Sequence, residues 1–274
     1  MNLTKTNKLL AIGNITAVSA TIIINILANS LPLNGKFTGE LSDSYPNLFV
    51  PAGLTFAIWG IIYLLLILFA IYQLRILLTK APKDYEFIQK IGVLFIIGSL
   101  GNIAWIFFWH YEQVLLSLGA MLLLFVSLLG IYLRLNIGKA SIPMHQKYFV
   151  HIPFSVYIGW ITVATVANVT ALLVDIDWQG FGIDPGTWTI LILAIVTLLT
   201  CLILITRKDI AYSFVVIWAL LGIYIKRTAS DPVFGIRQDI ANTAAIAIAI
   251  IALFILYVLF EYYRKRSTKD QIKS

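Results

Sequence analysis

Residues 149–174 read FVHIPFSVYIGWITVATVANVTALLV and contain no Asp, Glu, Lys or Arg. A helix needs about 20 mostly apolar residues to cross the hydrocarbon core of a bilayer, and this stretch is long enough. It also carries Tyr157, Trp160 and Asn168 at helical spacing, and lipid alone would not favour such a polar and aromatic stripe near the middle of a span. The stretch therefore predicts a membrane-spanning helix with one specialised face.

Seven further windows have the same character, and together they predict an all-α, polytopic transmembrane helical bundle of about eight spanning helices. The eight windows are residues 8–31, 51–79, 88–109, 113–135, 149–174, 187–206, 209–226 and 238–263. Because Lys5 and Lys8 precede an apolar run, the first window resembles a signal peptide. Its run is longer than the usual apolar region of about 7–15 residues and contains Asn14 and Asn25, so we expect a spanning helix.

The composition excludes most classes of soluble protein. Hydrophobic residues make up 60% of the chain and charged residues 12%, and the mean hydropathy is +0.90. An ordinary soluble domain is about 25% charged. Lys and Arg outnumber Asp and Glu by 20 to 13, which in a membrane protein indicates basic cytoplasmic loops rather than a nucleic-acid partner. The single cysteine, Cys201, excludes an intramolecular disulfide and a thiolate metal cluster.

The basic residues sort to one side of the expected membrane. With the N-terminus inside, four of the 20 fall in outer segments, namely Lys36, Lys226, Arg227 and Arg237. The remaining sixteen, which include Lys80 and Lys83, fall on the cytoplasmic side. This bias predicts that both termini are cytoplasmic, and it favours an even number of helices. We expect a multi-pass protein of the plasma membrane, in contact with the lipid bilayer.

No familiar catalytic or metal-binding motif is present in the sequence. It lacks a Walker loop, a His-Glu-x-x-His motif and a Gly-x-Ser-x-Gly motif, so we assign no catalytic residue. The outer loop at residues 175–186 contains Asp175, Asp177 and Asp184. It lacks the ligand order of a calcium-binding EF-hand loop, and we interpret it as a solvated acidic loop with no metal.

Three windows each carry a stripe of aromatic and amide side chains on one helical face. The stripes comprise Phe56, Trp59 and Tyr63 in the second window, Asn102, Trp105 and Trp109 in the third, and Tyr157, Trp160, Ala164 and Asn168 in the fifth. Amides within a membrane need partners, so these faces should turn inward. We expect Trp59, Trp105 and Trp160 to face one shared cavity, whereas Trp109 and Trp178, beside outer loops, fit interfacial anchors.

These stripes resemble the motifs of the TspO/MBR family, the tryptophan-rich sensory proteins and translocator proteins. The family pattern Tyr-x-x-Trp-x-x-x-Ala-Thr-x-x-Asn is matched by Tyr157, Trp160, Ala164, Thr165 and Asn168. The second window supplies Pro51 and the step from Trp59 to Tyr63, and the third supplies the Asn-x-x-Trp of Asn102 and Trp105. The family's first loop is rich in Trp and Pro, and the first loop here has no Trp.

The resemblance implies a five-helix TspO/MBR-like bundle over residues 1–174, with an additional three-helix transmembrane region over residues 175–274. It also implies an intramembrane pocket for a planar lipophilic ligand of tetrapyrrole (porphyrin) or sterol type. The residues expected to line that pocket are Trp59, Tyr63, Asn102, Trp105, Tyr157, Trp160 and Asn168. In the eighth window, Ala241, Ala245 and Ala249 form a small-residue ridge that would pack the extra helices or mediate a homodimer.

Three functions remain open from the sequence. The first is a membrane ligand-binding or sensory protein with a lipophilic small molecule as its partner. The second is a transporter or permease, which inverted repeats and helices broken at the midplane would favour. The third is a membrane-embedded lipid or isoprenoid enzyme, for which the candidate acid and base groups are His110, Glu112, His145 and His151.

The predicted topology can be tested with reporter fusions. A reporter at the C-terminus should give a cytoplasmic signal and a reporter inserted at Gly180 an external one, because the basic residues divide in that way. A cytoplasmic signal from the Gly180 insertion would contradict the eight-helix arrangement.

Overall fold

The computed structural model describes residues 4–31, 33–79 and 85–273, and these residues form helices joined by short loops, with no strand among them. The loop residues Lys80 and Lys83 lie outside the described ranges. The prediction of an all-α membrane bundle is confirmed. Seven helical segments are long and apolar enough to cross a membrane, and α5 (Leu94–His110) is a further apolar helix of 17 residues.

The seven long segments are centred on α1 (Lys5–Ser30), α3 (Ile58–Leu78), α6 (Val114–Arg134), α8 (Ile152–Asp175), α9 (Pro185–Arg207), α10 (Ile210–Thr228) and α11 (Gln238–Lys273). The shorter elements are η1 (Leu33–Gly35), α2 (Thr38–Asp43), η2 (Gly53–Ala57), α4 (Glu86–Ile91), α7 (Met144–Gln146), η3 (Lys147–His151) and η4 (Gly180–Gly182). Two of the long segments are extended by short elements, since η2 leads directly into α3, and α7 and η3 lead into α8.

The third window is not one continuous helix. Gly92, with φ +55°, ends α4, and α5 starts two residues later. Glycine adopts positive φ without the steric cost that a side chain brings, so the chain can turn sharply here. The expected span over residues 88–109 is therefore shortened to α5, and α4 forms a separate short helix.

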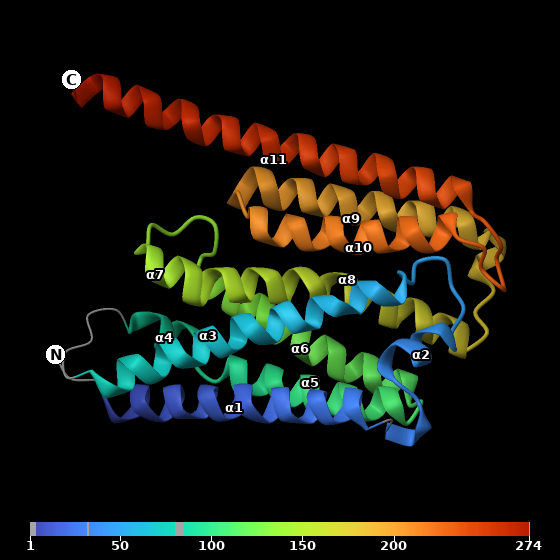
Figure 1. Ribbon diagram of the computed structural model, residues 1–274, viewed down its shortest axis with the longest axis horizontal. Helices are drawn as coiled ribbons and strands as arrows, with labels where there is room; N and C mark the ends of the chain where they lie inside the picture. Colours follow the sequence, from blue (N-terminus) through green and yellow to red (C-terminus); the bar gives the residue numbers. More distant parts are fainter. Residues whose placement is uncertain (1–3, 32, 80–84, 274) are drawn as a thin grey trace.

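The helices form two groups that meet along α8 and α10. Figure 1 shows α1, α3, α5, α6 and α8 together, with α10, α9 and α11 stacked beyond α8. The two termini lie at the same end of the bundle and α2 lies at the opposite end (Figure 1). We call the end with α2 the outer end, because the charge pattern predicts that it faces away from the cytoplasm. This orientation and the division into domains at residue 174 stay predictions.

Glycines permit close packing both within the first helix group and between the two groups. A Cβ on Gly101 of α5 would lie 3.0 Å from the backbone N of Leu124 and 3.1 Å from the carbonyl of Ala120, both in α6. A Cβ on Gly222 of α10 would collide with Pro51 and Thr55. Small residues permit such close approach in membrane bundles, where dispersion rather than the hydrophobic effect holds helices together.

The small-residue ridge of α11 is only partly buried. Ala241 is buried, but Ala245 and Ala249 are exposed. The buried face instead runs through Ala244 and Ala247, so the inward face of α11 is rotated from the expected one. α11 packs against α9 and α10 through this face.

Asp209 joins the two helix groups through buried hydrogen bonds. Its side chain accepts a bond from the N–H of Tyr212 at 3.2 Å and so caps α10. It also accepts from the hydroxyl of Tyr132 on α6 at 2.8 Å and from the hydroxyl of Ser155 on α8. A buried carboxylate is costly unless it is well bonded, and here three donors from three helices converge on it.

Replacing Asp209 should destabilise the fold more than replacing a comparable exposed capping residue. Asp209→Ala leaves the Tyr132 and Ser155 hydroxyls without their acceptor, at about 1–3 kcal/mol for each buried group. Asp184 also caps a helix, α9, but it is exposed, and Asp184→Ala should cost about 1 kcal/mol. Thermal unfolding in detergent measures both variants. Equal Tm values for the two would show that the Asp209 junction adds nothing beyond a helix cap.

Candidate functional site

Aromatic side chains from three helices meet around Trp59. Its ring stacks on Tyr63 at a centroid distance of 5.5 Å and on Trp105 at 6.2 Å. It meets Tyr157 and Trp160 edge-on, at 6.1 and 6.3 Å. Stacked and edge-on pairs at these separations are favourable beyond simple burial. The stripes of α3, α5 and α8 are therefore in mutual contact.

Two adjoining cavities open beside this aromatic cluster. The first has a volume of about 40 Å³ and is lined by Thr38, Ser42, Pro51, Phe56, Trp59, Trp105, Trp109, Trp160, Val163, Ala164, Ala167 and Asn168. The second, of about 280 Å³, is lined by Asn25, Ile26, Thr38, Gly39, Phe56, Trp59, Gly60, Tyr63, Trp105 and Ile106. Phe56, Trp59, Trp105 and Thr38 contribute to both, so these side chains form the partition between them. None of the described residues that line either cavity carries a formal charge.

The expected site residues have different positions around these cavities. Trp59 and Trp105 border both, Trp160 and Asn168 border the smaller, and Tyr63 borders the larger. Asn102 and Tyr157 border neither of the two. The structure therefore brings Trp59, Trp105 and Trp160 to one cavity.

Asn102 and Tyr157 belong to a chain of hydrogen bonds across three helices. The side-chain amide of Asn25 on α1 donates to Asn102 on α5 at 2.7 Å. The amide of Asn102 in turn donates to the hydroxyl of Tyr157 on α8 at 3.0 Å. All three residues are buried. Their polar groups use one another as partners, so this chain holds α1, α5 and α8 in register.

A second chain of hydrogen bonds fixes the position of Trp105. Its indole N–H donates to the side-chain oxygen of Asn168 at 2.9 Å, and the Asn168 amide donates to the hydroxyl of Ser117 on α6 at 3.0 Å. Ser117 also donates to the carbonyl of Val114 at 2.7 Å. The Trp105 ring therefore faces the cavity with its polar atom already bonded.

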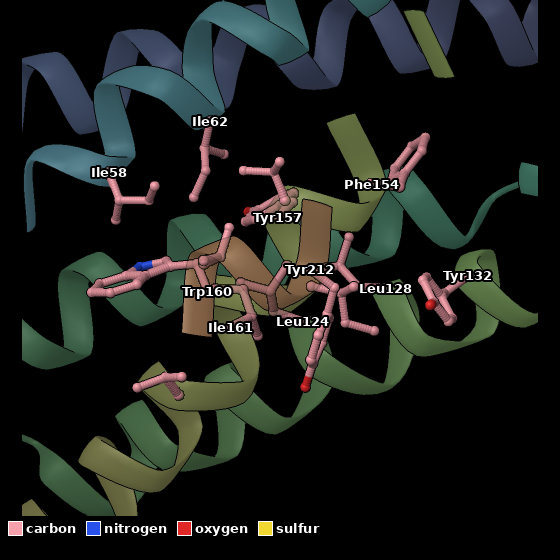
Figure 2. Close-up of a cluster of buried hydrophobic side chains, with 14 of the residues drawn as sticks. Ile58, Ile62, Leu124, Leu128, Tyr132, Phe154, Tyr157, Trp160, Ile161 and Tyr212 are labelled. Atoms are coloured by element: carbon pink, nitrogen blue, oxygen red, sulfur yellow. The ribbon is translucent and has the colours of Figure 1, made fainter. Parts of the chain in front are cut away.

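Trp160, unlike Trp105, has no partner for its indole N–H among the described residues. Its side chain is only 2% exposed. Figure 2 shows the indole extending from α8 beside Ile58 of α3, whereas Tyr157 lies nearer Ile62. A buried donor without a partner costs free energy that a suitable acceptor would recover.

Trp109 lines the smaller cavity, although its position beside an outer loop predicted an interfacial anchor. The interpretation as an interfacial anchor is wrong, because Trp109 is 6% exposed and stacks on Trp105 at 6.1 Å. Its indole N–H donates to the carbonyl of Thr38 at 3.3 Å. Its spacing from Asn102 and Trp105 already placed it on the same face, and that signal was the better guide.

The first loop covers the outer end of the site. Thr38 and Ser42 of α2 line the smaller cavity, and the Thr38 hydroxyl lies 3.3 Å from the Nε2 of His110. The Nδ1 of His110 lies 2.8 Å from the carbonyl of Ile106. Lys36 pairs with Glu112 at 2.8 Å across the same junction. Hydrogen bonds and an ion pair thus hold this loop, which lacks the tryptophans of the family's first loop.

The candidate acid and base groups are not assembled into a catalytic centre. His110 and Glu112 lie at the outer end, where Glu112 is engaged by Lys36. His145 and His151 lie at the opposite end, on α7 and at the end of η3 (Figure 1). His145 makes a ring contact with Tyr72 at 5.9 Å.

The fold and the site together define a multi-pass helical membrane protein with an uncharged aromatic cavity. The family whose description is TSPO-like protein matches residues 11–257. The chain belongs to this family. The match continues beyond α8, through α9 and α10 and into α11. The comparisons with curated proteins and with solved structures gave no significant match.

Proposed function

We propose that the protein binds a planar, largely apolar ligand of porphyrin or sterol type in the aromatic cavities, as a membrane ligand-binding or sensory protein. The observation that carries this proposal is the unpaired N–H of Trp160 beside a cavity lined by aromatic rings. Rings supply flat apolar contact area, and one donor selects a ligand with an acceptor at its edge.

The charge of the site supports an uncharged ligand body. Within the part of the chain that the structure describes, no side chain lining the two cavities is formally charged, and Lys36 on the first loop is paired with Glu112. A carboxylate or phosphate carried deep into this site would lose its hydration without gaining a cation. An anionic group on the ligand should therefore remain at the outer rim.

The size of the cavities requires the partition to move for a larger ligand. The larger cavity is about 280 Å³, and drug-sized ligands occupy pockets of about 300–1,000 Å³. Phe56 and Trp59 stand between the cavities and are only half-buried. Rotation of either side chain would join the two spaces and bring the ligand edge to Trp160.

Two further parts of the proposal concern the membrane in which the protein lies and the association of two copies of it. We propose that this multi-pass protein lies in the plasma membrane, and the bias of basic residues supports an orientation with the first loop outside. The exposed Ala245 and Ala249 on α11 offer a surface for close packing of a second copy.

Substitutions at Trp160 separate its two contributions to binding. Trp160→Phe keeps an aromatic ring but removes the donor, so the affinity for a neutral porphyrin diester should fall about two- to tenfold, as expected for one hydrogen bond of 0.5–1.5 kcal/mol. Trp160→Ala also removes the ring contacts and should weaken binding further. Fluorescence quenching titrations of the purified protein measure both affinities.

Trp188→Phe is the matched control, because Trp188 lines neither aromatic cavity and its replacement should leave the affinity unchanged. Wild-type affinity in both Trp160 variants, with normal expression, would place the ligand elsewhere.

A further inference from the structure

A third cavity lies at the outer end, between the two helix groups. Its volume is about 520 Å³, within the range of about 300–1,000 Å³ that small-molecule sites occupy. It shares no lining residue with the two aromatic cavities. Its walls come from the first loop, α8, the acidic loop, α9 and the α10–α11 loop, namely Pro46, Asn47, Leu48, Phe49, Thr170, Leu173, Val174, Asp177, Trp178, Gln179, Gly180, Ile183, Pro185, Trp188, Thr189, Ile192 and Phe234.

Two tryptophans form one end of this cavity. The rings of Trp178 and Trp188 lie 5.4 Å apart at an angle of 53°. The indole N–H of Trp188 donates to the carbonyl of Gly180 at 2.9 Å, and this bond fixes its ring. Gly180 has φ +62°, and a Cβ there would lie 3.2 Å from the Trp188 Nε1. The loop conformation and the indole position therefore depend on each other.

The charge at this end is negative. Asp177 is the only ionisable side chain among the described residues that line the cavity. It is exposed, and one of its carboxylate oxygens accepts a bond from Gln179 at 3.0 Å. The neighbouring cations are paired: Arg237 bonds to Asp239 at 2.7 Å, and Arg227 lies 3.3 Å from Asp231.

Phe234, which also lines the cavity, is already in contact with a cation. The guanidinium of Arg227 lies 5.8 Å from the centroid of the Phe234 ring. The other aromatic residues in the lining are Phe49, which is only 1% exposed, and Trp178 and Trp188, which come from the same loop and helix start as Asp177. Indole faces attract cations, most strongly where water is partly excluded.

We propose that this cavity binds an amphiphile with an organic cation as its head, either a quaternary ammonium or a protonated amine. The head lies against Asp177 and the indoles of Trp178 and Trp188. The apolar body extends along Leu173 and Ile192, between α8 and α9. The site lies where the outer loops join the spanning helices, the depth at which Trp residues and amphiphile head groups meet in a membrane.

Photo-crosslinking with matched probes tests this site. The probes share one alkyl chain with a diazirine and differ in the head, which is trimethylammonium, sulfate or a neutral hydroxyl. The full-length protein is labelled in a sugar-headed detergent, which has no competing cation, and labelled peptides are identified by mass spectrometry. The trimethylammonium probe should label residues 170–192 at least fivefold more than the sulfate probe.

Single substitutions then identify the groups responsible. Asp177→Asn should reduce labelling by the cationic probe at least fivefold, and Trp188→Leu should reduce it as well. Asp175→Asn, a change of the same kind at an exposed acid outside the cavity lining, should have no effect. Equal labelling by the three heads, or undiminished labelling of Asp177→Asn, would overturn the proposal.

The Trp160→Phe variant tests whether this site is separate from the aromatic cavities. It should leave the labelling of residues 170–192 unchanged, whether or not it weakens porphyrin binding. Loss of that labelling in Trp160→Phe would show that the probe occupies the aromatic cavities, and it would overturn the assignment of a second site.

Discussion

Buried amides and an indole on α1, α5, α6 and α8 bond to one another across the helices, because bulk water does not reach them, and these bonds fix how the four helices are arranged. Asn102 has partners on α1 and α8, and Asn168 has partners on α5 and α6. A rotation of α8 by one residue would break both chains of bonds. The aromatic rings are consequently held in one arrangement, with the donor of Trp160 left free.

Helices α9, α10 and α11 are attached to the other group by the same kind of interaction. At one end, Asp209 collects hydroxyl donors from α6 and α8. Toward the other end, the N–H of Ala52 donates to Gly222 at 3.0 Å, and the indole of Trp218 donates to the carbonyl of Thr55 at 2.9 Å. α10 therefore braces η2, the turn that contains Phe56 and leads into α3 and Trp59. Through this contact α10 supports the wall of the aromatic site.

Most of the fold could be predicted from the sequence, because spanning helices are set by length and hydropathy alone. The break at Gly92 and the rotated face of α11 could not be predicted, since both depend on which neighbouring helices these segments pack against. For the site, the stripes on three windows placed Trp59, Trp105 and Trp160 together. The spacing could not distinguish residues that border the cavity from Asn102 and Tyr157, whose polar groups bond to each other. It also gave no sign of Ser117 or Thr38, because single hydroxyls carry no pattern.

The distribution of bonded and unbonded polar groups distinguishes the two proposed ligand sites by their chemistry. In the aromatic cavities, the N–H of Trp105 is bonded and that of Trp160 has no partner among the described residues. These surroundings favour an uncharged ligand with one hydrogen-bond acceptor. In the outer cavity, the N–H of Trp188 is bonded and the carboxylate of Asp177 lines the same space, a combination that favours a cation. Under the two proposals, tryptophan contributes to two kinds of ligand site, and the difference arises from whether its indole nitrogen already has a hydrogen-bond partner within the protein.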